Sequence, residues 1–495
     1  MFNKNYATRF DERDIALNDG THQLSYGELR HYIQYLNQQM EALSITEEER
    51  VLILLPNGIH HIIAVFAAFS LGCVVVPMDI ESSESRLKQV VESVQPVLCI
   101  TFLASDVLDG VQVLNIGNIL HEPNHNDNDI LNVKKFERAK LLLFSSGSTG
   151  QPKGVVITYQ QQAHITKNIA ARVGTKKGDK ELLLAPSSHS DGWQRVMVAL
   201  YSGAQIVFPQ GLLSVSNILE TIAEEKITTL FIHPTLLRYL LKAKKDKVIK
   251  ALQSCHSIKT GGASLLPDEL ERFLSLVPNA NVYVHYGMSE SPRSTMASMK
   301  CGATNLHSVG TAMAGVTIMI ADLKGQPMPC GEIGEILIQG LHLSSGYWNQ
   351  TELFNDRFHD GWLHTGDFGS MDEQGALYFH GRKDDVISTS GYSFYPAEVE
   401  TLLGMIPDVQ EYLVLGIPDP KGMIGDEPWL FLIPEEDSQW EPKKFYDYAK
   451  PRLEKHMMPR RMIVVSSIPK TASGKANRKE MIEQFKRQGR SENDT

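Results

Sequence analysis

Cysteine is scarce in this sequence, and its five cysteines are scattered through 495 residues without a Cys-x-x-Cys pair. That spacing argues against a disulfide framework and against a zinc site, and it indicates buried small apolar side chains instead. Apolar tracts long enough to span a bilayer are also missing, which predicts no membrane span. Residues 1–6 lack the apolar core of a secretory signal, so a cytoplasmic protein is expected.

The sequence also lacks a long run of residues with the same charge. The formal net charge of −10 is spread along the chain, which predicts that nucleic acid is not a partner. The lysine cluster at 242–247 is interpreted as a solvated helix end. Residues 121–129 form a polar, turn-rich insert whose two histidines lack the fixed spacing of metal ligands, so a surface connection is predicted.

What is present indicates an α/β protein of more than one domain. The chain is too long for a single compact core. Strand-like apolar runs alternate with helical stretches through the first three quarters, which predicts largely parallel sheets. These runs include 51–55, 73–76, 97–100 and 282–285, with a helix from residue 59. After Gly340 shorter strands and turns lead to a compact final unit, and we place the domain boundary between Lys383 and Asp384.

Residues 141–154 contain an apolar strand that runs into the loop Ser-Ser-Gly-Ser-Thr-Gly-Gln-Pro-Lys-Gly. Small residues at 145–150 let the backbone approach an anion, and successive N–H groups and hydroxyls can surround phosphate oxygens. Lys153 adds a positive charge. A P-loop has Gly-Lys-[Ser/Thr] with a helix directly behind it, whereas here Gln151 and Pro152 intervene. The sequence therefore predicts an ATP-binding loop that moves rather than one that caps a helix.

This order of residues resembles the signature of the ATP-dependent acyl-adenylating superfamily, which includes acyl-CoA synthetases, carrier-protein adenylation domains and firefly-type luciferases. The resemblance extends from Leu24-Ser-Tyr-Gly-Glu-Leu29 to Lys475. It implies a large N-terminal domain, residues 1–383, of parallel-rich sheets with flanking helices and a small β-barrel-like portion. It also implies a small, mobile α+β C-terminal domain, residues 384–495, with a hinge at Asp384.

Two strand ends carry the residues that match the family's nucleotide contacts. His285-Tyr-Gly-Met-Ser-Glu290 ends an apolar strand, where ligands bind in open α/β sheets. In the family, the residues matching Tyr286, Ser289 and Glu290 pack on adenine, bond the α-phosphate and ligate Mg²⁺, for which a carboxylate is a suitable hard ligand. The resemblance places further adenine contacts at Gly262 and Ala263.

Asp367 matches the aspartate that accepts hydrogen bonds from both ribose hydroxyls, and Arg382 matches an arginine that also contacts ribose. Lys475, in the segment 469–475, matches the catalytic lysine on a mobile loop. Together with Lys475, the expected catalytic residues are Glu290, Thr149 and His189. The expected nucleotide and cofactor contacts are Ser145, Ser146, Gly147, Ser148, Thr149, Gly150, Lys153, Gly262, Ala263, Tyr286, Gly287, Met288, Ser289, Asp367, Arg382 and Gly391.

The implied reaction has two halves. An acid carboxylate attacks the α-phosphorus of ATP, while Lys475 bridges the two anions, Mg²⁺ on Glu290 offsets phosphate charge and the loop receives pyrophosphate. A pantetheine thiol then attacks the acyl-adenylate after the small domain rotates and brings Gly391 to the site. Many CoA ligases carry lysine where this chain has Ser388. Coenzyme A and the phosphopantetheine of an acyl or peptidyl carrier protein are equally compatible with these motifs.

The identity of the small carboxylic acid is expected to depend on residues 185–195. His189 matches a position that is often histidine in acyl- and aryl-CoA ligases, whereas amino-acid-activating relatives usually have aspartate there. Asp191, Trp193 and Arg195 complete the candidate acid pocket, and Arg195 or Asp191 is a candidate partner for a second polar group on the acid. Charges at a helix start that face solvent or the helix dipole are an equal alternative. Further candidate wall residues, each better explained as structural, are Tyr283, His233 and Arg238.

An ATP-dependent acid–thiol ligase is the leading interpretation. Alternatives within the family are an enzyme that loads a carrier protein and one that acylates an amine. A luciferase-like monooxygenase would share the fold and first step, and an inactive adenylate-binding protein would share the scaffold alone. Loss of catalysis would predict substitutions at Lys153, Glu290, Asp367 or Lys475, and all four positions are occupied.

Overall fold

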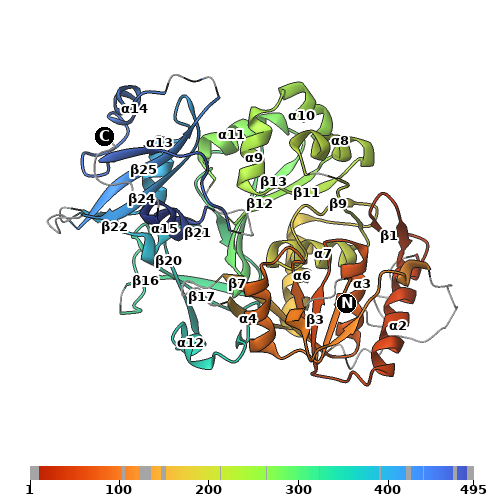
Figure 1. Ribbon diagram of the computed structural model, residues 1–495. Helices are drawn as coiled ribbons and strands as arrows, with labels where there is room; N and C mark the ends of the chain where they lie inside the picture. Colours follow the sequence, from red (N-terminus) through yellow and green to blue (C-terminus); the bar gives the residue numbers. More distant parts are fainter. Residues whose placement is uncertain are drawn as a thin grey trace.

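The computed structural model shows two large packed sheets with helices, and two small sheets in the C-terminal part (Figure 1). It describes residues 11–102, 106–121, 135, 137–146, 152–211, 213–262, 265–322, 324–389, 392–419, 425–436, 438, 440–471 and 476–487.

The first sheet has fourteen strands within the described residues and changes character at β13 (Asn281–Met288). Up to β13, neighbouring strands are parallel apart from the edge pair β1 and β2. This part comprises β1 (Ile15–Asn18), β2 (Gln23–Ser25), β9 (Lys180–Leu182), β10 (Gln205–Val207), β11 (Thr229–Phe231), β12 (Ser257–Gly261) and β13.

Beyond β13 the same sheet continues with antiparallel strands. These are β14 (Ser291–Met299), β15 (Gly310–Ala312), β16 (Val316–Ala321), β17 (Gly334–Gly340), β19 (Phe358–His359), β20 (Trp362–Met371) and β21 (Ala376–Arg382). The expectation of a mixed α/β fold is confirmed.

The second sheet has the order β18-β8-β7-β4-β3-β5-β6. Its parallel strands are β3 (Arg50–Leu54), β4 (Val74–Met78), β5 (Leu98–Thr101), β6 (Gln112–Leu114) and β7 (Lys140–Ser146), and antiparallel strands β8 (Pro152–Thr158) and β18 (Gly346–Tyr347) extend it beyond β7. The runs at 51–55, 73–76 and 97–100 are thus strands, as predicted.

Alternate residues of β3 and β4 point to opposite faces of the second sheet. Val51, Ile53 and Val75 belong to the core between the two sheets, while Leu52 and Val76 pack with helix α4 (Glu84–Val94) on the other face. Both sets are buried because helices cover both faces, which explains why these strands read as continuous apolar runs.

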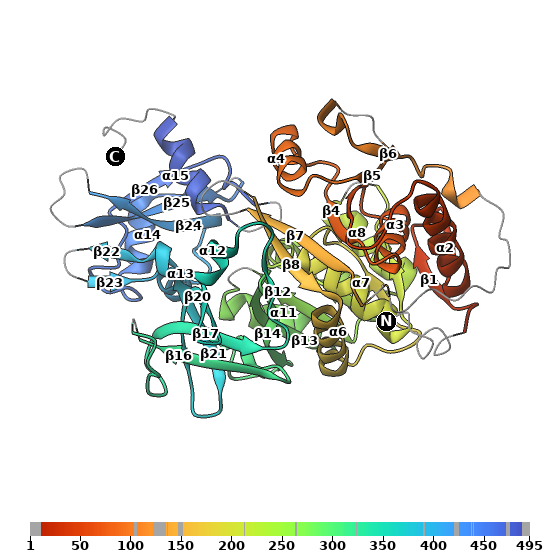
Figure 2. The ribbon, with the colours of Figure 1, turned by 90° about the horizontal axis from the view of Figure 1, so that it is seen from below.

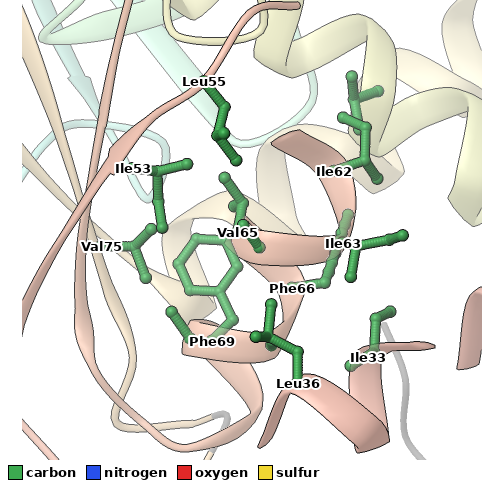
Figure 3. Packing of buried hydrophobic residues seen from close by; sticks show 14 of the residues in the cluster. Ile33, Leu36, Ile53, Leu55, Ile62, Ile63, Val65, Phe66, Phe69 and Val75 are labelled. Carbon is green, nitrogen blue, oxygen red and sulfur yellow. The ribbon is translucent and has the colours of Figure 1, made fainter. Parts of the chain in front are cut away.

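Helix α3 (Ile59–Ser70) lies between the sheets, and eleven of its twelve residues are buried. A helix that is apolar on all sides belongs in such a position. Figure 3 shows Phe66 and Phe69 of α3 packed with Ile53 and Val75 of the second sheet. Helices α2 (Tyr26–Ala42) and α7 (Ser190–Ser202) share this core.

The remaining helices of residues 11–382 cover the outer surfaces. Strands β9 to β13 pack against α8 (Val215–Glu225), α9 (Pro234–Lys242), α10 (Lys245–Leu252) and α11 (Pro267–Leu276). Helix α6 (Tyr159–Val173) follows β8 and begins at a capping box of Thr158 and Gln161. Short turns of helix are η1 (Asp106–Leu108), η2 (Ile119–His121) and α12 (Thr351–Asn355). No helix in the described ranges is long and apolar enough to cross a membrane.

Residues after β21 form a second unit with its own core clusters, which contain only residues from Ile387 onward. Its elements are η3 (Lys383–Asp385), β22 (Ile387–Thr389), β23 (Tyr392–Phe394), α13 (Pro396–Leu403), β24 (Val409–Pro418), β25 (Asp426–Pro434), α14 (Pro442–Ala449), β26 (Arg461–Val464) and α15 (Arg478–Arg487). Figures 1 and 2 show this unit on one side of the molecule, and Lys242 of α9 pairs with Glu435 across the junction at 3.2 Å. The boundary at 383/384 and the mobility of the unit stay predictions.

Candidate functional site

The predicted ATP loop connects two antiparallel strands. Ser145 and Ser146 end β7 and pair with Lys153 and Pro152 at the start of β8. A strand therefore follows the loop, and the prediction that it does not cap a helix is confirmed. The expected phosphate contacts at Gly147, Ser148, Thr149 and Gly150 lie outside the described residues, as do Ala263, Gly391 and Lys475.

Lys153 lies beside other cations. Its ammonium group is 5.7 Å from the centre of the Tyr347 ring. Burial lowers the pKa of Lys153, and the nearby positive charges of Arg357, Arg382 and Lys479 lower it further, while Glu290 opposes them. Repelling cations held together in this way favour a polyanionic ligand. Lys479 follows Lys475 by four residues, so the C-terminal unit contributes charge to this cluster.

Glu290 lies in the tight turn between β13 and β14, and it is largely buried. The hydroxyl of Tyr347 donates a hydrogen bond to its carboxylate, and Nη1 of Arg357 lies 3.3 Å from the same oxygen. Gly287 lets this turn close, because a Cβ there would lie 2.5 Å from the backbone nitrogen of Arg293. The turn thus holds one buried carboxylate next to the cations around Lys153.

Asp367 and Arg382 face each other across the β20–β21 hairpin. They are register partners, and Arg382 Nε lies 3.2 Å from Asp367 Oδ1. The hydroxyl of Tyr286 donates to Asp367 Oδ2 at 2.8 Å. Burial raises the pKa of Asp367. The structure therefore brings together three residues that the sequence assigned to adenine and ribose.

Gly262, the other described adenine candidate, follows the end of β12. Its φ is +83°, and that of Gly261 is +157°, where a Cβ would lie 2.6 Å from the His285 ring. Both values belong to the region that favours glycine. Met288 ends β13 and Ser289 follows it, so all of these residues lie at the carboxyl ends of β12 and β13. Asp384 is exposed in η3, directly after β21.

His189 occupies the position before the first residue of α7, and its side chain does not cap the helix. Ser188 Oγ lies 3.1 Å from His189 Nδ1. Burial lowers the pKa of His189, as does the positive charge of Arg86, while Asp79 opposes this shift. Arg86 donates to the carbonyl of Phe144 at 3.0 Å, so His189 lies near the strand that leads into the ATP loop.

Two of the three other acid-pocket candidates share a face of α7, because Asp191 and Arg195 are four residues apart. Asp191 pairs with Arg293 of β14 at 2.7 Å, and Arg195 is buried. Trp193 points elsewhere: its indole packs against Phe66 and Phe69, and Nε1 donates to Gln162 at 3.0 Å. The grouping of Trp193 with the other two is therefore corrected, because a residue two positions along a helix faces away.

Three residues at this site were missed by sequence reasoning. Tyr347 and Arg357 contact Glu290, and Arg293 pairs with Asp191. Arg293 has a φ of +57°, which is uncommon for a residue other than glycine. Of these three residues, only Arg357 could have been singled out from the sequence, because it lies ten residues before Asp367 in an aromatic-rich segment. Arg238, a candidate wall residue, instead pairs with Glu269 at 2.6 Å.

Comparison with known proteins places the chain in a family. A model of AMP-binding enzymes matches residues 4–348, and a model of their C-terminal domain matches residues 398–475. A putative acyl-CoA ligase, YdaB, from Bacillus subtilis (strain 168) is 29% identical over 94% of each chain, and a feruloyl-CoA synthase from Amycolatopsis sp is 26% identical over 96% of this chain and 97% of its own.

The structure of o-succinylbenzoate CoA synthetase (MenE) from Bacillus subtilis, in complex with the acyl-adenylate intermediate OSB-AMP, is similar with a TM-score of 0.83. It is 26% identical, and the match covers 96% of each chain. Since one family model alone spans more than half of the sequence, the chain belongs to the AMP-binding enzymes of the acyl-adenylating superfamily.

Proposed function

We propose that this protein joins a small carboxylic acid to AMP at the expense of ATP, and then transfers the acyl group to a pantetheine thiol. The convergence of Lys153, Arg357 and Arg382 on the two carboxylates of Glu290 and Asp367 carries the proposal. Such a site can hold a nucleotide at Asp367 and its phosphates at the cations. The names of relatives as CoA ligases and synthases support the thiol as acceptor.

In the first step, a carboxylate oxygen of the acid bonds to the α-phosphorus and the bond to the β-phosphate breaks, so pyrophosphate leaves. Asp367 accepts hydrogen bonds from the ribose hydroxyls, and the Tyr286 ring supports adenine. Lys153 is assigned to offset phosphate charge, and Lys475 is assigned to the attacking carboxylate and the α-phosphate. Fixed cations that oppose developing negative charge lower the barrier without reorganising.

Glu290 fits Mg²⁺, which proteins typically hold through one or two carboxylates together with substrate phosphates and water. Within the described ranges, no group of three histidine, cysteine, aspartate or glutamate side chains could hold a metal. A single carboxylate beside a phosphate site matches that ligand set. Bound Mg²⁺ would neutralise charge on the leaving phosphates.

In the second step, the thiol sulfur bonds to the acyl carbon, AMP leaves and the thiol proton is released. We assign this step to a rotated C-terminal unit in which Asp384 is the hinge and Gly391 approaches the acyl group. Ser388, exposed on β22, takes the place of a lysine common in CoA ligases. The proposed acceptor is coenzyme A, and a carrier-protein phosphopantetheine or an amine is the alternative.

A panel of carboxylic acids tests the proposal through ATP-dependent pyrophosphate release. Each acid is assayed alone, with coenzyme A, with a phosphopantetheinylated carrier protein and with an amine. We expect one acid class to release pyrophosphate and coenzyme A to yield a thioester. Glu290→Gln is expected to reduce release, while Glu373→Gln, an exposed change between β20 and β21, leaves it unchanged. If no acid gives release, the proposal fails.

A further inference from the structure

Arg195 is a buried cation without a hydrogen-bonding partner. It lies on α7 with 2% of its surface exposed. Its nitrogens Nε, Nη1 and Nη2 all lack a hydrogen-bond partner among the described residues. The guanidinium contacts the Phe231 ring, whose centre is 5.8 Å away. Burying a charge without a partner is costly, so an arginine in this state requires an explanation.

The carboxylates around Arg195 are already engaged by other cations. Glu181 lies 2.6 Å from Lys259, and Asp191 lies 2.7 Å from Arg293. Neither carboxylate pairs directly with Arg195, whose nitrogens lack a hydrogen-bond partner among the described residues. Burial and the positive charge of Arg293 lower the pKa of Arg195 to about 10, which still leaves it charged at neutral pH. A ligand that pairs with the charged guanidinium of Arg195 is therefore an anion.

Ring contacts lead from Arg195 through Phe231 to His285 on β13, the strand that also carries Tyr286. Phe231, at the end of β11, lies 6.0 Å from the His285 ring between centres. His285 precedes Tyr286, which donates to Asp367. Arg195 is thus close to the carboxyl ends of β11 and β13, where the adenylated carboxylate of the acid must lie if Tyr286 and Asp367 hold the nucleotide.

We propose that Arg195 binds a second carboxylate on the acid, and that the substrates of this enzyme are dicarboxylic acids. This inference rests on the proposed adenylation activity. A guanidinium matches a carboxylate by two parallel hydrogen bonds, and it would gain in the complex the partners it lacks here. Asp191 is held by Arg293, so the same helix face offers no free carboxylate to an ammonium group.

The test compares acids of equal chain length that differ in one group: butyrate with succinate, hexanoate with adipate, and benzoate with the three benzenedicarboxylates. Pyrophosphate release is measured for the wild-type protein, Arg195→Met, Arg195→Lys and the control Arg13→Met, whose side chain is 89% exposed in the wild type. We expect a diacid to exceed its monoacid by about a hundredfold in kcat/KM. Arg195→Met should abolish that preference, Arg195→Lys should retain part of it, and Arg13→Met should not change it.

A wild-type preference for the monoacid of every pair would overturn the assignment of Arg195 while leaving adenylation intact. No release with any acid would overturn both. Folding is checked by the melting temperature of each variant. Because Arg195 has no hydrogen bond to lose, and a methionine side chain can keep the contact with the Phe231 ring, Arg195→Met should melt close to the wild type. A large decrease would mean that Arg195 is a structural partner of Glu181, whose second carboxylate oxygen also lacks a hydrogen bond, and would overturn the proposal.

Discussion

Arg357 lies 3.3 Å from the carboxylate of Glu290 through Nη1, and it also binds the backbone that leads to Asp367. Its Nε donates to the carbonyl of His364 at 3.2 Å, and its Nη2 donates to the carbonyl of Thr365. One side chain therefore joins the carboxylate assigned to Mg²⁺ with the strand that carries Asp367, the carboxylate assigned to the ribose.

Replacement of Arg357 by alanine should weaken the use of ATP more than the use of the acid. The variant loses charge-assisted hydrogen bonds to Glu290 and to two carbonyls, each of which is worth about 1.5–3 kcal/mol when one partner is charged. We expect kcat/KM for ATP to fall at least about tenfold, with a smaller change in the KM of the acid. Steady-state pyrophosphate release with each substrate varied measures both. Arg487→Ala, at an exposed arginine, is the control, and unchanged ATP kinetics in Arg357→Ala would contradict this role.

Asp367→Asn should weaken discrimination between ATP and its deoxy analogues. The carboxylate accepts from Tyr286 and Arg382, and its remaining lone pairs are assigned to the ribose hydroxyls. The wild type should therefore favour ATP over 2′-deoxy-ATP and 3′-deoxy-ATP, and the variant should favour it less, by about tenfold. Initial rates with the three nucleotides measure the ratio. Tyr286→Phe removes one donor to Asp367 and retains the ring, so it should alter the ratio less than Asp367→Asn. Equal ratios in all three proteins would rule out ribose recognition by Asp367.

Residues that lie at strand ends could be predicted from the sequence, because strand direction and register place them. Asp367 and Arg382 are fifteen residues apart, and the hairpin of β20 and β21 makes them partners. Tyr286 lies near the end of β13 and Glu290 follows this strand, whose apolar run is evident in the sequence. These positions depend on local structure, which the sequence pattern reports well.

Contacts between distant segments could not be predicted in this way. Tyr347 of β18 and Arg357, which directly precedes β19, both contact Glu290. The sequence of these two segments does not indicate that either residue contacts Glu290. The antiparallel continuation of the first sheet could not be predicted from the sequence either. A strand as short as β15, Gly310–Ala312, is too short to show the alternation of apolar and polar residues that identifies a strand. Trp193 was misplaced because its neighbours in sequence suggested one pocket, whereas the helix turns it toward Phe66.

Lys475→Ala should separate the two half-reactions. The lysine is assigned to the adenylation step alone, where it offsets the charge of the carboxylate and the α-phosphate. Pyrophosphate release from acid and ATP should stop, while thioester formation from a supplied acyl-adenylate and coenzyme A should continue at a rate close to that of the wild type. Lys443→Ala, on the exposed side of α14, is the matched control and should retain both steps. Equal loss of both steps in Lys475→Ala would contradict the rotation of the C-terminal unit.

His61 should make the protein less stable in weak acid. It is fully buried in α3, and burial lowers its pKa from 6.5 to about 4. Because the folded protein resists protonation there, the unfolded chain takes up a proton first as the pH falls below 6.5. The contribution of His61 to the free energy of unfolding is therefore fully present above pH 6.5. It decreases toward pH 4 and levels off below pH 4, with a total change of about 3 kcal/mol.

Urea unfolding from pH 7.5 to pH 4 measures this decrease in the free energy of unfolding. His61→Leu cannot take up a proton, so its curve should be flatter than that of the wild type, although it will not be level, because burial also lowers the pKa of His342 to about 4. His121→Leu, at an exposed histidine, should leave the slope unchanged. Parallel curves for His61→Leu and the wild type would contradict this prediction. They would show that protonated His61 finds a partner for its proton within the folded core.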